Sequence, residues 1–545
     1  MLTGCVPWPA DLAERYRAAG YWEGVTLFGM VERTIARNPG KLAIVHGEER
    51  LTYGELGERT RRLAKGLLQA GIAALDRVVV QLPNTPMFAC AYLALTAIGA
   101  IPVMALRAHR RTEVVHFVNA SGAIAYLVPD AIGSFDYRTL AREVAAECPS
   151  LRLVLVDGEP GPGQRSLREL AAGAAHGEAA SLPSHVDPQE VATMLLSGGT
   201  TSLSKLIPRT HDDYVLNARL CGAAAGFDAD TVLMAILPLA HNYNLASPGM
   251  LGAFYRGATV VLAPSGDAHT VFSLVERERV SVIAAVVPLI VNWLDSDAAT
   301  RYDVSSLRVV QNGGARLQPE LRARLRSRFG CMPQEVYGTA EGLINMTRLD
   351  DADELVLQSS GAPVCDDDEI RVEDESGREL PDGEAGELVT RGPYTIRGYY
   401  NAPDKNLEAF TPDGFYRMGD IVRKRGRYVF AEGRKKDFIN RGGEKISCEE
   451  VEGFIVEHPK VKAVALVAMP DPVFGEKACA FVIAHEGQTL TFDELVDFLR
   501  ARGIASFKLP ERLECVDAFP VSPVGKILKR ALRESLVARM GAQQR

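Results

Sequence analysis

Hydrophobic positions in the first 330 residues alternate between helical and strand-like spacing. Residues 56–70 place apolar side chains at helical intervals, which predicts a helix, and residues 76–81 form a short β-branched run, which predicts a strand. Similar strand-like runs recur at residues 123–128 and 258–263. Alternation of this kind predicts an α/β fold in which helices cover the faces of a sheet.

The pattern changes three times farther along the chain. Residues 157–185 are rich in Gly, Ala, Ser and Pro, which predicts an irregular loop on the surface. Residues 370–400 read as short strands separated by turns, which predicts a small antiparallel or barrel-like unit. From residue 433 on, we expect a compact α+β unit of about 110 residues, with helices at 449–458, 492–502 and 526–539 and a strand at 461–469.

Size and composition exclude several classes of protein. A chain of 545 residues exceeds one ordinary core, so at least two domains are expected, and 47% hydrophobic with 24% charged residues is typical of soluble proteins. The net charge of −8, without a dense Lys/Arg block, argues against a nucleic-acid partner. The most apolar run, 283–291, is interrupted by Pro288 and is shorter than the ~20 residues of a membrane span. We therefore expect a cytoplasmic protein without a membrane partner.

The nine cysteines are scattered and contain no C-x-x-C pair. An odd number without that spacing indicates neither a disulfide framework nor a zinc site. They are expected to be reduced.

The densest chemical signal is the run from Ser197 to Lys205, with two glycines, five hydroxyl side chains and a lysine. Glycines let backbone N–H groups turn toward an anion, and the lysine adds a mobile positive charge, so the run is typical of a polyphosphate loop. The spacing does not match a Walker loop, and a flexible surface turn stays an alternative. Four further motifs follow in order: Tyr337-Gly-Thr-Ala-Glu341, Tyr416-Arg-Met-Gly-Asp420, Gly433-Arg-Lys-Lys-Asp437 and Pro520-Val-Ser-Pro-Val-Gly-Lys526.

Together these motifs resemble the adenylate-forming superfamily of acyl-CoA synthetases, luciferases and adenylation enzymes, over nearly the whole chain. The chain is most similar to stand-alone aryl-acid adenylating enzymes of siderophore synthesis, the 2,3-dihydroxybenzoate-AMP and salicylate-AMP ligases. This similarity rests on the sequence motifs Pro208-Arg-Thr-His-Asp-Asp213, His241-Asn-Tyr243, Ser247-Pro-Gly249, the run 341–350 and Asn440-Arg-Gly-Gly-Glu-Lys445. The family pattern has glycine and proline where Ser202 and Ser204 stand.

The resemblance implies a large N-terminal domain, residues 1–434, built of α/β subdomains with a small β-barrel-like subdomain at about 350–432. A small mobile α+β lid, residues 435–545, would follow a hinge at Lys436. Gly442 and Gly443 would line a tunnel for a phosphopantetheine thiol. The state of association, monomer or homodimer, stays open.

The resemblance also implies an enzyme that uses ATP and Mg²⁺. Its catalytic residues would be Lys526, Glu341 and Arg434, and Glu341 with Thr201 would hold the metal. Nucleotide contacts would come from Ser197, Gly198, Gly199, Thr200, Thr201, Lys205, Gly313, Gly314, Ala315, Tyr337, Gly338, Thr339, Asp420 and Arg434. An exposed lysine or glutamate is ordinarily only solvated, so these roles depend on the family pattern.

The implied aryl-acid pocket comprises His241, Asn242, Tyr243, Ser247, Val287, Gly313 and Ile344. Ser247 favours 2,3-dihydroxybenzoate, because a buried hydroxyl left unpaired beside salicylate costs roughly 1–3 kcal/mol. Ile344 argues against this acid. The dihydroxybenzoate enzymes of the family usually carry valine at this position, and the extra methylene of isoleucine narrows the slot for the aromatic ring. The expected activity is formation of the aryl adenylate with release of pyrophosphate, then transfer to an aryl carrier protein. The alternatives are a salicylate-AMP ligase, an aryl- or acyl-CoA ligase using free coenzyme A, and an inactive adenylate-binding protein.

Overall fold

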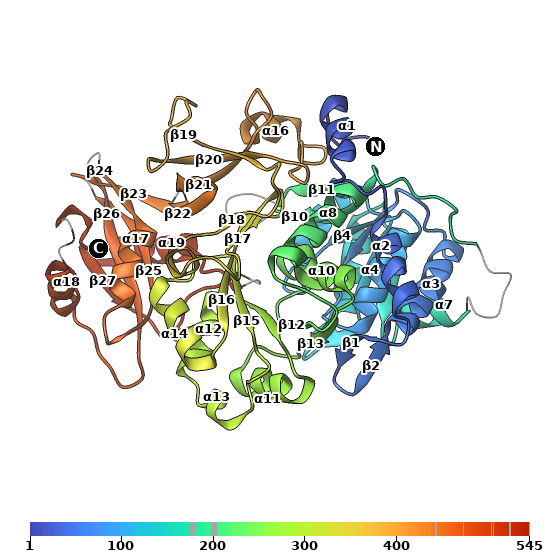
Figure 1. The fold of residues 1–545 in the computed structure, drawn as a ribbon, viewed down its shortest axis with the longest axis horizontal. Helices are drawn as coiled ribbons and strands as arrows, with labels where there is room; N and C mark the ends of the chain where they lie inside the picture. The colour runs from blue at the N-terminus through green and yellow to red at the C-terminus, as the bar shows by residue number, and fades with distance from the viewer. Residues whose placement is uncertain are drawn as a thin grey trace.

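The computed structural model describes residues 1–173, 181–197, 204–434, 437–441, 444–471, 473–502, 504, 506–522 and 525–543 (Figure 1). Two sheets with helices on both faces form the larger part of the molecule. A four-stranded sheet and a smaller α/β unit follow toward the C-terminus.

The first sheet has seven strands in the order β11-β10-β4-β3-β5-β8-β9. Its pairs are parallel except for β10 with β11, which is antiparallel. The strands are β3 (Arg77–Val80), β4 (Ile101–Met104), β5 (Ala125–Pro129), β8 (Leu153–Asp157), β9 (Arg165–Ser166), β10 (Val191–Leu196) and β11 (Leu206–Thr210).

The second sheet has nine strands in the order β18-β17-β16-β15-β14-β12-β13-β1-β2. Its central strands are parallel, and its edges are closed by antiparallel pairs. The strands are β1 (Leu42–His46), β2 (Glu49–Thr52), β12 (Val232–Ala235), β13 (Thr259–Leu262), β14 (Val282–Ala285), β15 (Val309–Gly313), β16 (Met332–Thr339), β17 (Gly342–Met346) and β18 (Ala362–Pro363).

One group of helices is buried between the two sheets. Apolar side chains of these helices and of the inner face of each sheet form one hydrophobic cluster. The helix α4 is apolar on all sides, as a helix buried on every face must be. The group is α2 (Leu27–Arg37), α3 (Tyr53–Gln69), α4 (Pro86–Ala97), α7 (Leu167–Gly173), α8 (His211–Ala224), α9 (Asn242–Ala246) and α10 (Gly249–Arg256).

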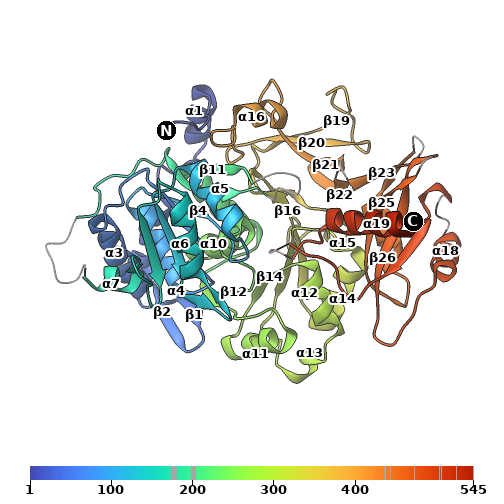
Figure 2. The ribbon, with the colours of Figure 1, turned by 180° about the vertical axis from the view of Figure 1, so that it is seen from behind.

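The outer faces of both sheets are covered by further helices. On the seven-stranded sheet these are α5 (Arg111–Ser121) and α6 (Tyr137–Glu147), seen from behind in Figure 2. On the nine-stranded sheet they are α11 (Ala268–Glu278), α12 (Val287–Asp295), α13 (Ala298–Arg301) and α14 (Pro319–Phe329). The peripheral elements are α1 (Ala10–Ala18), α15 (Asp353–Gln358) and the hairpin of β6 (Ala131–Ile132) and β7 (Phe135–Asp136).

The expected β-rich unit is an antiparallel sheet in the order β19-β20-β21-β22. Its elements are β19 (Glu369–Glu373), β20 (Ala385–Arg391), α16 (Pro403–Ala409), β21 (Tyr416–Arg425) and β22 (Tyr428–Arg434). Asp420, in the middle of β21, pairs directly across the sheet with Arg434, the last residue of β22.

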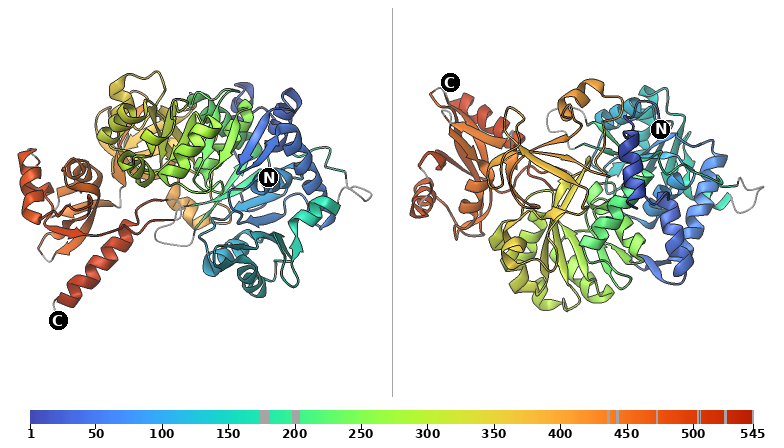
Figure 3. Two further views of the ribbon diagram at one scale, coloured as in Figure 1. Left: turned by 90° about the horizontal axis from the view of Figure 1, so that it is seen from below. Right: turned by 45° about the horizontal axis from the view of Figure 1, so that its top comes forward.

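The C-terminal unit, called the lid below, stands to one side of the layered core (Figure 3). Alternate residues of its strands point to two clusters, so α17 and α18 cover one face and α19 the other. Its elements are β23 (Phe438–Arg441), β24 (Glu444–Ser447), α17 (Cys448–Val456), β25 (Val461–Asp471), β26 (Gly475–Ala484), α18 (Phe492–Ala501), the short 3-10 turn Ser506–Lys508, β27 (Arg512–Cys515) and α19 (Lys529–Gln543).

The α/β class, the antiparallel unit and the lid elements are confirmed, and two predictions were wrong. The segment 157–185 contains β9 and α7, whose Leu167 and Leu170 are buried against the core. The last helix begins at Lys529 rather than at Lys526, because the backbone N–H of Ser522 donates to the carbonyl of Lys526 (2.7 Å) and closes a turn there. Within the described ranges, no helix is long and apolar enough to cross a membrane.

Candidate active site

The loop predicted to hold phosphate is closed at its base by two hydrogen bonds. The N–H of Ser197 donates to the carbonyl of Lys205 (3.0 Å), and the N–H of Lys205 donates to Oγ of Ser197 (2.9 Å). Gly198, Gly199, Thr200 and Thr201, together with Ser202, lie outside the described residues. The base of the loop therefore joins β10 to β11 and holds Lys205 at its end.

Lys205 and Glu341 meet around one tyrosine ring that the sequence did not single out. Nζ of Lys205 lies 4.1 Å from the ring centre of Tyr399, and the hydroxyl of Tyr399 donates to Oε1 of Glu341 (2.8 Å). Burial lowers the pKa of Lys205, while the carboxylate of Glu341 opposes that change. The ammonium group of Lys205 and the carboxylate of Glu341 thus both contact Tyr399, at the C-terminal end of the predicted phosphate loop.

Glu341 lies in the tight turn between β16 and β17, as predicted, and is only 6% exposed. Two hydrogen bonds fix the backbone of the turn. The N–H of Ile396 donates to the carbonyl of Glu341 (2.7 Å), and Nη1 of Arg209 donates to the carbonyl of Ala340 (2.9 Å). The backbone of this turn is therefore held by Arg209 on β11 and by Ile396 in the segment before Tyr399.

Tyr337, Asp420 and Arg434 form the second polar group of the site. The buried Asp420 accepts a hydrogen bond from the hydroxyl of Tyr337 (2.8 Å) on Oδ2 and pairs with Nε of Arg434 (3.1 Å) on Oδ1. The negative charge of Asp420 raises the pKa of Arg434. Each carboxylate oxygen keeps a second lone pair for a further donor.

The glycine strip at the end of β15 lies next to Tyr243 of the predicted acid pocket and to Lys526 of the lid. A Cβ atom on Gly313 would lie 2.8 Å from the Tyr243 ring, and a Cβ on Gly314 would lie 3.1 Å from Cε of Lys526. A Cβ on Gly313 would therefore clash with the Tyr243 ring, whereas at Gly314 the φ of +87° favours glycine. Ala315, the next residue, is exposed. Lys526 of the lid therefore contacts the core at Gly314, next to Gly313 of the predicted acid pocket.

The residues predicted to bind the acid lie on four elements. His241 caps α9, where its Nδ1 accepts from the N–H of Tyr243 (3.3 Å). Burial, with a smaller contribution from the charge of Lys526, lowers the pKa of His241 to about 3, so this imidazole is neutral. The remaining predicted residues are Asn242 and Tyr243 on α9, Ser247 just after it, Val287 at the start of α12, Gly313 at the end of β15 and Ile344 on β17.

Gly338 and Thr339, the other two predicted nucleotide contacts, lie on β16 before the turn. Gly338 pairs with Ile344 across the hairpin, and the hydroxyl of Thr339 donates to the carbonyl of Gly342 (3.0 Å). Both belong to the strand that carries Tyr337 and leads into the turn of Glu341. Lys436, Gly442 and Gly443, the predicted hinge and tunnel residues, lie outside the described residues.

The comparisons with known proteins come from both sequence and structure. The family model described as AMP-binding enzyme matches residues 31–400, and the model of its C-terminal domain matches residues 450–526. The chain belongs to the AMP-binding enzyme family. The predicted family resemblance is therefore confirmed.

Three relatives illustrate the position of the chain within this family. It is 47% identical to the 2,3-dihydroxybenzoate-AMP ligase of Bacillus subtilis, over 98% of each chain. It is 44% identical to the salicyl-AMP ligase / salicyl-S-ArCP synthetase of Mycobacterium tuberculosis, over 98% of this chain and 95% of the relative. The apo structure of Mycobacterium smegmatis MbtA superposes with a TM-score of 0.75 at 41% identity, covering 98% of this chain and 99% of that one.

The residues of this AMP-binding enzyme fit a magnesium ion that would be held mainly by the phosphate oxygens of a bound nucleotide. Mg²⁺ prefers hard oxygen ligands and is commonly bound through one or two carboxylates plus substrate phosphates. Glu341 offers such an oxygen close to the phosphate loop. Within the part of the chain that the structure describes, no group of three or more His, Cys, Asp or Glu side chains could hold a metal by itself.

A buried carboxyl behind Ile344 makes the stability of the enzyme depend on pH. The N–H of Ile344 donates to the hydroxyl of Tyr394 (3.1 Å), and that hydroxyl donates to Oδ2 of the buried Asp368 (2.5 Å). Burial raises the pKa of Asp368 to about 7. The native state therefore favours the neutral carboxyl, and this contribution to stability is lost as the pH rises from about 4 to 7.

We expect Asp368→Asn to gain stability relative to the wild type as the pH rises. The amide keeps the acceptor for Tyr394 and cannot ionise, so its advantage should grow by roughly 2–3 kcal/mol between pH 5 and pH 8. Thermal unfolding of both proteins at each pH measures this, and the difference between them cancels the other titrating groups. An equal difference at pH 5 and pH 8 would contradict the prediction.

Proposed function

We propose that this chain activates an aryl acid with ATP. The acid carboxylate attacks the α-phosphorus, the aryl adenylate forms, and pyrophosphate leaves. The observation that carries the proposal is the position of Lys526, a lid residue whose side chain packs on Gly314 and whose charge acts on His241 at the start of α9. A cation there is suited to the negative charge that develops during adenylation.

The other polar groups are assigned to ATP. The loop from Ser197 to Lys205, with Gly198, Gly199, Thr200 and Thr201, would hold the phosphates, and Glu341 with Thr201 would hold Mg²⁺. Asp420 would accept the ribose hydroxyls, with Arg434 as the nearby cation. Adenine would lie on the strip formed by Gly313, Gly314 and Ala315, next to Tyr337, Gly338 and Thr339.

The acid is proposed to be 2,3-dihydroxybenzoate, with salicylate as the alternative. The pocket residues Asn242 and Ser247 and the high identity to a 2,3-dihydroxybenzoate-AMP ligase support this choice. Oγ of Ser247 already accepts from Nδ2 of Asn217 (3.1 Å) and Nδ2 of Asn242 (3.2 Å). Salicylate would therefore leave only the hydroxyl hydrogen without a new partner, so the preference should be smaller than for a wholly unpaired hydroxyl.

The second half-reaction is proposed to transfer the aryl group to the phosphopantetheine thiol of an aryl carrier protein. The sulfur attacks the acyl carbon, the thioester forms, and AMP leaves. Lys526 must first withdraw. The family resemblance implies a hinge at Lys436, at the start of a lid spanning 435–545, and a thiol tunnel lined by Gly442 and Gly443. The name salicyl-S-ArCP synthetase, carried by a relative of 44% identity, supports this acceptor.

We expect thioester formation with a holo aryl carrier protein to exceed that with free coenzyme A. Enzyme, ATP, Mg²⁺ and 2,3-dihydroxybenzoate are incubated with each acceptor, and the thioester is quantified by mass spectrometry. The apo carrier protein, which lacks the thiol, is the control. Equal or faster formation of the coenzyme A thioester would overturn the carrier assignment and leave the adenylation step standing.

A further inference from the structure

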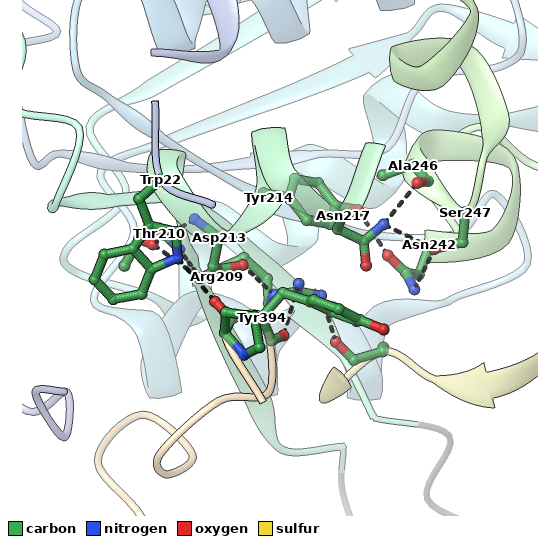
Figure 4. A network of polar contacts seen from close by, with 12 residues as sticks. Trp22, Arg209, Thr210, Asp213, Tyr214, Asn217, Asn242, Ala246, Ser247 and Tyr394 are labelled. Atoms are coloured by element: carbon green, nitrogen blue, oxygen red, sulfur yellow. Dashed lines mark hydrogen bonds and ion pairs between the residues drawn. The ribbon is translucent and has the colours of Figure 1, made fainter. Parts of the chain in front are cut away.

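The side-chain amide of Asn242 is held by a tyrosine from a neighbouring helix. Tyr214 lies in the first turn of α8 and is fully buried, and its hydroxyl donates to Oδ1 of Asn242 (2.8 Å) (Figure 4). Its ring lies 4.7 Å from the guanidinium carbon of Arg209, which itself forms a buried pair with Asp213. Tyr214 is therefore fixed from the side opposite to Asn242.

The bond from Tyr214 determines which end of the amide is available to a ligand. Oδ1 of Asn242 accepts from the phenol, and Nδ2 donates one hydrogen to Oγ of Ser247 (3.2 Å). A carboxamide nitrogen carries two hydrogens, so one N–H is left to donate. Among the residues that the structure describes, no other acceptor is recorded for the Tyr214 hydroxyl, so a flipped amide would leave that hydroxyl hydrogen without its acceptor.

Ser247 is held in the same network from its other side. Nδ2 of Asn217 donates to the carbonyl of Ala246 (2.6 Å) and to Oγ of Ser247 (3.1 Å), as Figure 4 shows. Both lone pairs of Oγ thus accept from amide donors, one of which is Nδ2 of Asn242 in the orientation that the Tyr214 bond requires. The amides of Asn217 and Asn242 and the hydroxyl of Ser247 therefore form one chain of hydrogen bonds that begins at Tyr214.

We propose that Tyr214 is a specificity-determining positioning residue, which holds the Asn242 amide so that an N–H donor, not the carbonyl oxygen, faces the acid. This rests on the proposed aryl-acid function. The ortho hydroxyl of a 2-hydroxybenzoate donates its hydrogen to the adjacent carboxylate and leaves its oxygen as an acceptor. An N–H from Asn242 matches that oxygen, whereas the amino group of 2-aminobenzoate offers mainly hydrogens.

The variant Tyr214→Phe tests this proposal, because it removes one oxygen and frees the amide to rotate. We expect the ratio of kcat/KM for 2,3-dihydroxybenzoate over benzoate to fall about tenfold, as the loss of one oriented hydrogen bond predicts. The ratio for 2-aminobenzoate over benzoate should rise, and the KM for ATP should not change. Acid-dependent ATP–pyrophosphate exchange measures all three.

Tyr126→Phe is the matched control. Tyr126 is also fully buried, and its hydroxyl also donates to a side-chain amide oxygen, that of Gln81, in the seven-stranded sheet away from the pocket. We expect it to lower the melting temperature without changing the acid ratios. In an Asn242→Leu background, Tyr214→Phe should have no further effect on the ratios, because Tyr214 acts through the amide.

Failure of the role proposed for Tyr214 and failure of the proposed function would give different results. A wild-type enzyme that prefers ortho-hydroxy acids, with ratios unchanged in Tyr214→Phe, overturns the role of Tyr214 and leaves the proposed function intact. Equal changes in Tyr126→Phe, or a further change in the Asn242→Leu background, also overturn that role. A wild-type enzyme without exchange on any aryl acid overturns both proposals.

Discussion

Replacing Arg209 with methionine is expected to destabilise the enzyme by about 3–5 kcal/mol, the usual cost of breaking a buried ion pair. Arg209 is 0% exposed, and its Nε donates to Oδ1 of Asp213 (2.7 Å). Nη1 and Nη2 donate to the carbonyls of Ala340 (2.9 Å) and Tyr394 (3.0 Å). The substitution therefore leaves a buried carboxylate and two buried carbonyls without these donors.

An exposed pair with the same spacing provides the control. Arg530 and Glu534 are also four residues apart (Nε to Oε1 2.7 Å) but are more than half exposed, and such a pair contributes only about 0.3–0.5 kcal/mol. Arg530→Met should leave the melting temperature nearly unchanged, whereas Arg209→Met should lower it by many degrees. Melting of Arg209→Met within one degree or so of the wild type would contradict the assigned importance of the buried pair.

Replacing Lys526 with alanine is expected to reduce acid-dependent ATP–pyrophosphate exchange by roughly 10²–10³-fold, the cost of losing one group that stabilises transition-state charge. The side chain packs on Gly314, and its charge contributes to the lowered pKa of the adjacent His241. Transfer from a preformed aryl adenylate to the carrier thiol should be retained, because in the proposed second half-reaction Lys526 withdraws before the thiol approaches. The two assays therefore separate a role in adenylation from damage to the lid.

Lys460→Ala is the matched control for this experiment. Lys460 lies in the same lid, where its Nζ pairs with Oε1 of Glu494 (2.7 Å) at the surface. We expect both half-reactions to proceed normally in that variant. An equal loss of both half-reactions in Lys526→Ala would show that the substitution disrupts the lid, and would contradict a specific role in adenylation.

The elements of the fold could be predicted where hydrophobic spacing was regular. The strand at residues 461–469 and the helix at 492–502 lie within one or two residues of their predicted ends, because the strand is a nearly continuous apolar run and the helix has one clearly apolar face. The helix α7 was missed, because Leu167 and Leu170 are embedded in a segment otherwise rich in Gly and Ala. The start of α19 was misplaced, because the turn at Ser522 depends on hydrogen bonds that apolar spacing does not reveal.

The candidate site could be predicted only as separate motifs. The sequence indicated Glu341, Asp420 and Lys526 one by one, and their roles stay predictions. It gave no signal for Tyr399, which contacts both Lys205 and Glu341, because that link requires two distant segments to pack together. Arg209 and Asp213 have the spacing of a helical ion pair, but their burial beneath the Glu341 turn depends on the tertiary fold.

The most direct test of the central claim is ATP–pyrophosphate exchange by the wild-type enzyme with 2,3-dihydroxybenzoate, salicylate, benzoate and a medium-chain fatty acid. We predict strong exchange that depends on the aryl acid and is fastest with 2,3-dihydroxybenzoate. Faster exchange with salicylate would contradict the choice of acid and would point to Ile344 as the dominant side chain. Exchange only with the fatty acid, or with none of the four, would contradict the proposed activation of an aryl acid.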